Sequence, residues 1–355
     1  MTVPPEGNPA AALHLLGRDP GHVEMQQGRP FCGKAGQLLD RLLGKAAIRR
    51  QDCYIDNVIQ TQPQGNDWNA HSVADQLSAK ARIGNAIRTH KPKLVVAFGN
   101  EAFRVAMGQH PNDRGELPSI TDARGYLWDS PLGTRVLAAI HPAATLREHS
   151  PWYPLTIWDL RKAKREVDTG CPPFPTREVK IVTHESDYQE VRNACSAMPW
   201  ISLDIENTAE LQLACLGVGV RDDLAFVIPA THGRHLSFIR ELCESAYPKV
   251  FQNGMYDRYF LRRICDIEVA NVVFDTMLAW HTLQPELAGM REEVSARKRM
   301  RRKTQKSLRM LASIYTREPF WKDYDFAAQE DQYILNGKDC CVTLEIAAKQ
   351  QEQLR

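Results

Sequence analysis

The sequence predicts an α/β protein made of two domains, and three observations support this fold class. Apolar runs of strand length alternate with helical patterns in both halves of the chain, which is typical of mostly parallel sheets covered on both faces. A chain of 355 residues is too long for one ordinary core. Three prolines at positions 172, 173 and 175 forbid helix and form a stiff connector. We therefore expect domains at residues 1–168 and 178–355, joined by a linker at 169–177.

Within the first domain, four apolar runs are read as strands and two amphipathic patterns as helices. The strands are expected at 12–16, at 53–55 with 58–59, at 93–98 and at 135–140, and the helices at 36–43 and 74–90. In the second domain, strands are expected at 179–182, 201–206, 213–220 and 224–228. A short apolar run at 249–252 then precedes a helix, and the rest is expected to be mostly helical.

Composition narrows the class of protein. The formal net charge is only +2, so any affinity for nucleic acid has to come from local patches. The nine cysteines are odd in number and scattered, and no C-x-x-C pair occurs, which argues against a zinc ribbon or a disulfide scaffold. No apolar run is long enough to span a membrane, and no leader pattern opens the chain. We expect a soluble cytoplasmic protein that makes no membrane contact.

Four acidic residues stand at strand ends and helix starts in the second half. Asp204 and Glu206 are two apart on a strand, so their side chains point the same way. Asp257 belongs to an Asn253-x-x-x-Asp257 element that opens a helix, and Asp339 lies further on. Such a set suits two hard divalent cations, which can clamp a scissile phosphate. Each acid alone could simply end a strand or cap a helix, but the ordered set predicts a nuclease.

These motifs, with the stretches at 274–281 and 306–312, resemble the DEDD 3′–5′ exonucleases, specifically the proofreading domains of phage-like family A DNA polymerases. The resemblance covers residues 178–355. It implies a ribonuclease H-like fold that holds two Mg²⁺ or Mn²⁺ ions and acts on DNA 3′ ends, with Asn253 in a substrate-binding element and a DNA polymerase as a candidate partner. The metal ligands it implies are Asp204, Glu206, Asp257 and Asp339.

The chain departs from this family at the group that orients the attacking water. The family has Tyr four residues before the last Asp, or His five before, where this chain has Leu335 and Ile334. The candidate for the role is Tyr333, six residues before Asp339. On a regular helix that spacing sets the two side chains about 120° apart, so the role requires an irregular backbone.

A basic run without acids lies between the second and third motifs. It is either a solvated helix face or a phosphate contact, and in a DNA-processing enzyme the second reading is favoured. The residues expected to contact DNA here are Arg297, Lys298, Arg301 and Arg302.

The first half carries glycine-rich turns at 17–21 and 28–36. Glycines permit close backbone approach to a ligand at a helix start. Asp19, Asn57 and His141 follow three separate predicted strands, and strand ends of an α/β sheet commonly converge on one pocket. The sequence therefore predicts a ligand pocket formed by these three side chains.

The order and spacing of these elements over residues 10–165 resemble the uracil-DNA glycosylase superfamily, nearest to its family 4. The resemblance implies a three-layer α/β/α fold that flips uracil out of DNA. It assigns stacking on the base to Phe31, hydrogen bonds to its edge to Asn57, and exclusion of a C5 methyl to Glu24. It assigns stabilisation of the departing base to His141 and probing of the duplex to Leu146 and Arg147.

Two departures from family 4 concern catalysis and a cofactor. Arg18 stands where family 4 has Glu, but Asp19 occupies the place of the water-activating Asp in the family 1 Gly-Gln-Asp-Pro-Tyr motif. The iron–sulfur cluster of family 4 needs four cysteines. None occurs among residues 1–16, Thr61 stands at another ligand position, and none follows it before Cys171. We predict that no iron–sulfur cluster is bound.

Three functional hypotheses follow. The first is a phage-type fusion that excises uracil and trims DNA 3′ ends, working in the cytoplasm of a bacterium or a phage-infected host. The second is an exonuclease tethered to a module that binds uracil-containing DNA without cleaving it. The third is the front end of a family A polymerase, although no palm or fingers signature is present.

Overall fold

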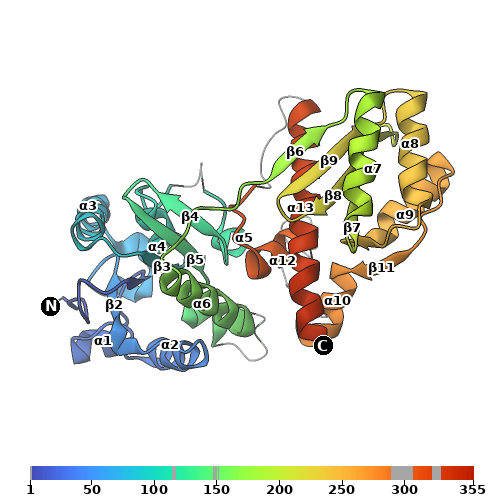
Figure 1. Cartoon of the computed structure of the whole chain (residues 1–355). Helices are drawn as coiled ribbons and strands as arrows, with labels where there is room; N and C mark the ends of the chain where they lie inside the picture. The colour runs from blue at the N-terminus through green and yellow to red at the C-terminus, as the bar shows by residue number, and fades with distance from the viewer. Residues whose placement is uncertain (1, 114–116, 147–149, 151, 289–306, 322–328) are drawn as a thin grey trace. The chain divides into compact units, whose positions relative to one another are not determined.

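The computed structural model describes residues 2–113, 117–146, 150, 152–288, 307–321 and 329–355. The chain divides into two compact units, Met1–Phe174 and Pro175–Arg355, which are here called the N-terminal and C-terminal units. Each unit is built on one sheet (Figure 1). No helix in the described parts of the chain has the length and apolar character needed to cross a lipid bilayer.

The N-terminal sheet has five strands in the order β2-β1-β3-β5-β4. The first four of these are mutually parallel, and β4 pairs antiparallel with β5 at the edge. Every residue of β1 and β3 is buried, as expected for strands covered on both faces. The strands are β1 (Leu13–Gly17), β2 (Cys53–Asn57), β3 (Leu94–Phe98), β4 (Leu127–Ser130) and β5 (Thr134–Ala139).

Helices cover both faces of this sheet and complete a three-layer α/β/α arrangement. Side chains of α2 and α6 pack with one set of alternating strand residues, and those of α3 and α4 pack with the other set. The α-helices of the N-terminal unit are α1 (His22–Gln27), α2 (Lys34–Lys45), α3 (Val73–His90), α4 (Asn100–Ala106), α5 (Ile120–Ala123) and α6 (Trp152–Asp168). The loop after β2 contains the 3-10 turns η2 (Gln64–Asn66) and η3 (Trp68–Ala70), and the loop after β5 contains η4 (Pro142–Thr145).

The C-terminal sheet has six strands in the order β11-β10-β7-β8-β9-β6. β7, β8 and β9 form an antiparallel meander, while β10 and β11 on one side and β6 on the other add parallel pairs. The strands are β6 (Glu178–Ile181), β7 (Ile201–Asn207), β8 (Leu213–Arg221), β9 (Leu224–Pro229), β10 (Lys249–Phe251) and β11 (Val272–Asp275).

One face of this sheet packs on three helices and the other on one long helix (Figure 1). The first face buries alternating β7 and β8 residues such as Leu203, Ile205, Leu216 and Val218. The opposite face receives α13, which contacts β6, β7, β8 and β9. The helices are α7 (Tyr188–Ser196), α8 (Gly233–Glu244), α9 (Gly254–Cys265), α10 (Thr276–Leu283), α11 (Pro285–Ala288), α12 (Leu308–Tyr315) and α13 (Gln329–Leu354).

The strands expected from the sequence are present with small shifts at their ends, but three details differ. Residues 58–59 form a bend after β2 rather than extending the strand. β4 was not expected, because its pairing depends on an edge that only β5 provides. β11 was not expected either, because its four residues pair only with β10, which has three.

Because α13 packs closely on β8, we predict that any larger residue in place of Gly217 lowers the stability of the C-terminal unit. A Cβ atom on Gly217 would lie 2.4 Å from Asn336 Oδ1 and 2.6 Å from Cys340 Sγ, whereas one on Gly233 would meet no atom within 4 Å. Overpacking should make Gly217→Ala lower the free energy of unfolding of the C-terminal unit by about 1 to 3 kcal/mol. Gly233→Ala, the matched control, should change it by less than about 0.5 kcal/mol. Urea unfolding of the full chain measures both, and equal effects of the two substitutions would contradict the prediction.

Candidate active sites

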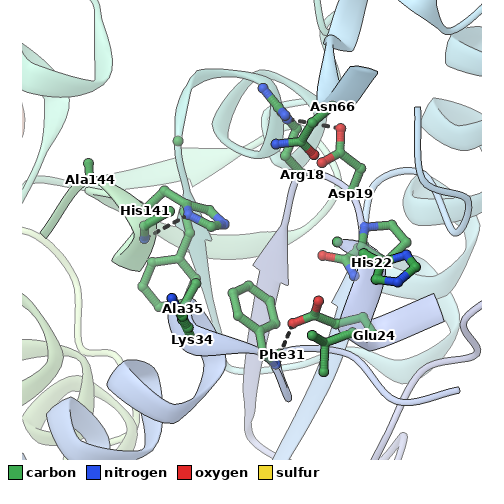
Figure 2. Close-up of a pocket in the computed structure, with 18 of the residues that line it drawn as sticks. Arg18, Asp19, His22, Glu24, Phe31, Lys34, Ala35, Asn66, His141 and Ala144 are labelled. Carbon is green, nitrogen blue, oxygen red and sulfur yellow. Dashed lines mark hydrogen bonds and ion pairs between the residues drawn. The ribbon is translucent and has the colours of Figure 1, made fainter. Parts of the chain in front are cut away.

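The N-terminal unit contains a cavity of about 450 Å³ at the ends of its central strands. Figure 2 shows the side chains that converge on it from the segment after β1, helix α1, the loop before α2, and the turn after β5. The structure thus brings together Asp19, Glu24, Phe31, Asn57 and His141, which the sequence had placed in five separate segments. Further lining residues are Arg18, His22, Lys34, Asn66 and Glu101.

Phe31 has a backbone conformation that a bulky residue rarely adopts. Its φ is +49°, and its ring is buried and stacked on the His141 ring with centroids 5.7 Å apart. Arg50 donates to the carbonyls of Pro30 and Phe31 at 2.7 and 3.1 Å. The buried Glu24 Oε1 accepts from the N–H groups of Cys32 and Gly33 at 3.1 and 2.7 Å. These bonds to charged groups hold the ring in the cavity wall.

Gly17, the last residue of β1, makes room for two of the predicted substrate-binding groups. A Cβ atom there would lie 2.4 Å from Asn57 Oδ1 and 2.5 Å from the Phe31 ring. Gly17 and Asn57 are also register partners in the parallel pair of β1 and β2. The glycine therefore lets the Asn57 amide and the Phe31 ring approach each other at the floor of the cavity.

The tautomer of His141 follows from its hydrogen bond. Its Nδ1 accepts from the Ala143 N–H at 3.2 Å, so in the neutral ring the proton is on Nε2. Burial lowers the pKa of His141 to about 4, and the nearby Arg18 guanidinium lowers it further in the same direction. At neutral pH His141 is thus an uncharged donor at the cavity wall (Figure 2).

Asp19 lies on the side of the cavity opposite His141 in Figure 2. The Arg18 Nε donates to Asp19 Oδ2 at 2.9 Å, and the Asp19 side chain is buried. Burial raises the pKa of Asp19, and the Arg18 guanidinium opposes that rise. The residue keeps a carboxylate within reach of the cavity, which is the geometry that its predicted role requires.

The remaining predictions for the N-terminal unit concern its surface and its cysteines. Leu146 ends the η4 turn with its side chain 45% exposed, and Arg147 lies outside the described residues. The three cysteines of this unit each donate to a different backbone carbonyl, those of Arg29, Arg49 and Lys93. Three separated thiols do not form a four-thiolate cage. The absence of an iron–sulfur cluster stays a prediction.

In the C-terminal unit, Asp204 and Glu206 project from β7 toward α13. Asn336 of α13 is fully buried, and its Nδ2 donates to Asp204 Oδ2 at 2.8 Å. Ser202, on the same face of β7, donates from its Oγ to the Cys340 carbonyl at 2.8 Å. These contacts bring the strand that bears two of the acids against the helix that bears Asp339.

Asp257, in the first turn of α9, is buried beside β7. Its Oδ1 accepts from the Ile205 N–H at 3.2 Å. Burial raises the pKa of Asp257 to about 7; the Ile205 hydrogen bond opposes the rise, and the carboxylates of Asp275 and Glu206 add to it. Burial, with a smaller contribution from the neighbouring carboxylates, thus disfavours ionisation of Asp257.

Asp275 joins the starts of two helices, a role that the sequence analysis missed. Its Oδ2 accepts from the Gly254 N–H at 2.8 Å, and its Oδ1 accepts from the Met277 N–H at 2.9 Å. The preceding Asn253 has φ +63°, a left-handed conformation that Asn tolerates better than most residues. Asp275 therefore fixes the turn from which Asp257 enters the site.

The last motif lies on α13, which is one helix from Gln329 to Leu354. Asp339 Oδ1 accepts from the Nε1 of the buried Trp321 at 3.0 Å. Tyr333 is 8% exposed and packs with Cys215 and Val227 against the sheet. Leu335, at the family's Tyr position, is half-buried.

The four acids suit a metal by donor chemistry. All are oxygen ligands, which hard divalent cations prefer, and a nearby cation would oppose the burial and the carboxylate repulsion that raise the pKa of Asp257. Within the described ranges, no three His, Cys, Asp or Glu side chains are arranged as a ready metal site. The predicted DNA-contact residues Arg297, Lys298, Arg301 and Arg302 lie outside those ranges.

Comparisons with known proteins divide the chain at the same place. Residues 4–164 match the uracil DNA glycosylase superfamily, and residues 179–354 match a 3′–5′ exonuclease family. A type-4 uracil-DNA glycosylase of Thermotoga maritima is 33% identical over 160 residues, which cover 45% of this chain and 79% of that protein. A type-4 uracil-DNA glycosylase of Pyrobaculum aerophilum is 31% identical over 152 residues, 41% of this chain and 74% of that protein.

Two solved structures are similar to half of the chain. The catalytic core of RRP6 from Trypanosoma brucei has a TM-score of 0.39 and 13% identity, with 50% of this chain and 47% of that one covered. Escherichia coli RNase D, an exoribonuclease involved in structured RNA processing, has a TM-score of 0.35 and 16% identity, with 50% and 45% covered.

The two matched families define a hydrolase that acts on DNA. The chain belongs to the uracil DNA glycosylase superfamily through its N-terminal unit, and a 3′–5′ exonuclease domain follows it. The predicted fold class, a glycosylase-like α/β domain followed by a ribonuclease H-like domain, is confirmed.

The neutral state of His141 generates a pH prediction. Its pKa in the folded chain is about 4 against an ordinary 6.5, so between these values only the unfolded chain binds the proton. The contribution of His141 to stability is therefore complete above pH 6.5 and is lost as the pH falls toward 4. An NMR titration of the His141 ring should show a midpoint below 5. A midpoint near 6.5 would contradict the assignment of a partly buried, neutral ring.

Proposed function

We propose that the chain carries two hydrolytic activities: excision of uracil from DNA by the N-terminal unit and 3′–5′ trimming of DNA by the C-terminal unit. The observation that supports the first most strongly is the convergence of Phe31, Asn57, His141 and Asp19 on one cavity. The second is supported by the three contacts that orient the acids, from Asn336, Ile205 and Trp321. We infer that residues 1–168 and 178–355 are the corresponding functional domains.

In the glycosylase site, the Phe31 ring stacks on the flipped base and the Asn57 amide hydrogen-bonds its edge. The C1′–N1 bond breaks and its electron pair leaves with the base. The neutral His141 donates a hydrogen bond from Nε2 to the base oxygen on which that charge accumulates. Water forms the new bond to C1′, and the proton it loses goes to the Asp19 carboxylate. Glu24 narrows the cavity where the C5 methyl of thymine would lie.

In the exonuclease site, two Mg²⁺ or Mn²⁺ ions are proposed to be held by the carboxylates of Asp204, Glu206, Asp257 and Asp339. When bound, such ions supply charge stabilisation at the scissile phosphate and lower the pKa of a bound water. The chain's own part is to hold the ligands: Asn336 orients Asp204, and Trp321 orients Asp339. Asn253 would contact the substrate beside Asp257, and Tyr333 remains the candidate water-orienting group. A DNA polymerase partner remains a prediction.

Uracil excision is tested with a 5′-labelled oligonucleotide that contains one uracil, incubated in EDTA so that metal-dependent cleavage is suppressed. An alkali-labile break should appear at the uracil. Asp19→Asn should slow its formation by about 100-fold or more, because a general base is lost, while DNA binding is spared. Asp129→Asn, on the exposed edge strand β4, is the matched control and should retain the full rate. If the unaltered chain binds uracil-containing DNA but never releases base, the N-terminal unit is a binding module.

Trimming of 3′ ends is tested with labelled single strands in Mg²⁺ or Mn²⁺. A ladder from the 3′ end should form, and EDTA should abolish it. Removal of a group that orients a metal ligand costs about 10- to 100-fold, so Asp204→Ala should cost at least about 100-fold. Asp223→Ala, in the exposed turn between β8 and β9, should leave the ladder unchanged. A ladder that persists in Asp204→Ala would contradict the assignment of the site.

A further inference from the structure

A histidine behind the glycosylase cavity has a buried nitrogen without a hydrogen bond. His71 follows the η3 turn, is 8% exposed, and does not line the cavity. Its Nε2 is buried and, among the residues that the structure describes, has no hydrogen-bond partner. The same atom lies 3.6 Å from Asp19 Oδ2. An unpaired polar atom in a core costs free energy, so its position beside a buried carboxylate calls for an explanation.

The two basic groups at Asp19 approach the same oxygen. Arg18 Nε lies 2.9 Å from Oδ2 and His71 Nε2 lies 3.6 Å from it. In the part of the chain that the structure describes, Oδ1 accepts no hydrogen bond. The carboxylate is therefore held by one oxygen, and the other is left for a ligand in the cavity.

A chain of partly buried hydrogen bonds runs from Trp68 to the backbone of His71. Trp68 Nε1 donates to Asn112 Oδ1 at 2.7 Å, and Asn112 Nδ2 donates to Gln76 Oε1 at 2.9 Å. Gln76, on α3, donates in turn to the His71 carbonyl at 3.1 Å. The Trp68 ring meets the His71 ring edge-on with centroids 5.2 Å apart, and the Arg18 guanidinium lies over the same Trp68 ring. One framework thus positions both basic groups.

We propose that His71 is a positioning residue for Asp19: it holds Oδ2 so that Oδ1 faces the reacting water, and it favours the ionised carboxylate. The inference rests on the proposed glycosylase activity. None of the residues to which the family resemblance assigns a role lies in the loop after β2, which holds His71. If His71 had a purely structural role, its Nε2 would not need a carboxylate beside it.

The proposal has a consequence for the pH dependence of uracil release. Three charged or titratable groups surround Asp19: the Arg18 guanidinium, the His71 ring and the Glu101 carboxylate. Arg18 and His71 favour the ionised form of Asp19, whereas Glu101 opposes it. Without the His71 ring, Asp19 keeps its proton to a higher pH. The acid limb of the rate profile should therefore move upward by about one pH unit.

The test is the single-turnover rate of uracil release by the full chain, in EDTA, as a function of pH, for His71→Gln. The maximal rate should fall about tenfold, which corresponds to a coupling of ordinary size. The acid limb should shift upward, and affinity for uracil-containing DNA should change less than about twofold. His90→Gln is the matched control, because the His90 Nδ1 is also buried without a hydrogen bond but faces His14 and Tyr54. It should change neither the rate nor the acid limb.

The possible outcomes distinguish failure of the proposed glycosylase function from failure of the role proposed for His71. If the unaltered chain releases no uracil, the proposed glycosylase function fails, and the inference fails with it. If the unaltered chain is active and His71→Gln keeps its rate and acid limb, the inference alone is overturned. Should His71→Gln not fold, the same rate and pH profile are measured for His71→Asn. A rate and an acid limb equal to those of the unaltered chain would overturn the proposal.

Discussion

The close approach of α13 to the C-terminal sheet is the contact on which the acid cluster depends. Cβ atoms at Gly217 and Gly219 would lie 2.4 Å from Asn336 Oδ1 and 2.3 Å from Ser202 Oγ. Without side chains at these two positions, the helix can pack at backbone distance and Ser202 can bond the Cys340 carbonyl. Only at this separation can an amide on α13 reach Asp204. The positions of the acids therefore depend on the two glycines of β8 as well as on the strand and helices that carry the acids.

In the N-terminal unit a glycine again permits a close backbone approach, here beside a residue with a strained backbone conformation. Gly36 leaves space for the Phe31 carbonyl, which would be 1.9 Å from an added Cβ. The left-handed backbone of Phe31 costs about 1 to 3 kcal/mol, and hydrogen bonds to charged groups contribute about 1.5 to 3 kcal/mol each. Four such bonds, from Arg50 and to Glu24, flank the residue and offset the strain. Glu24 therefore supports the stacking ring as well as lining the cavity.

The sequence predicted most of the strands, because buried strands are encoded in local patterns, and the acid and pocket residues were proposed from local patterns as well. Buried strands appear as apolar runs, and Asp204 and Glu206 share a face through the two-residue period of β7. The groups that orient the acids were missed, since Asn336 lies 132 residues from Asp204 and Trp321 lies 18 residues from Asp339. Nothing near His71 in the sequence points to Asp19, 52 residues earlier, until the loop after β2 is folded. The short strands β4 and β11 were missed for the same reason: each depends on a neighbour for its pairing.

The continuity of α13 separates two functions that the exonuclease family combines on one helix. Because the helix is unbroken through Tyr333 and Asp339, the Tyr333 ring stays in the apolar cluster with Cys215 and Val227, on the β8 and β9 side. Asn336 and Asp339, one turn further on, face the acids of β7 and the Trp321 indole. Leu335 brings no hydroxyl to the family's Tyr position. The helix thus supplies the Asn336 contact to Asp204 and carries Asp339, but at the position of the family's water-orienting Tyr it offers only Leu335.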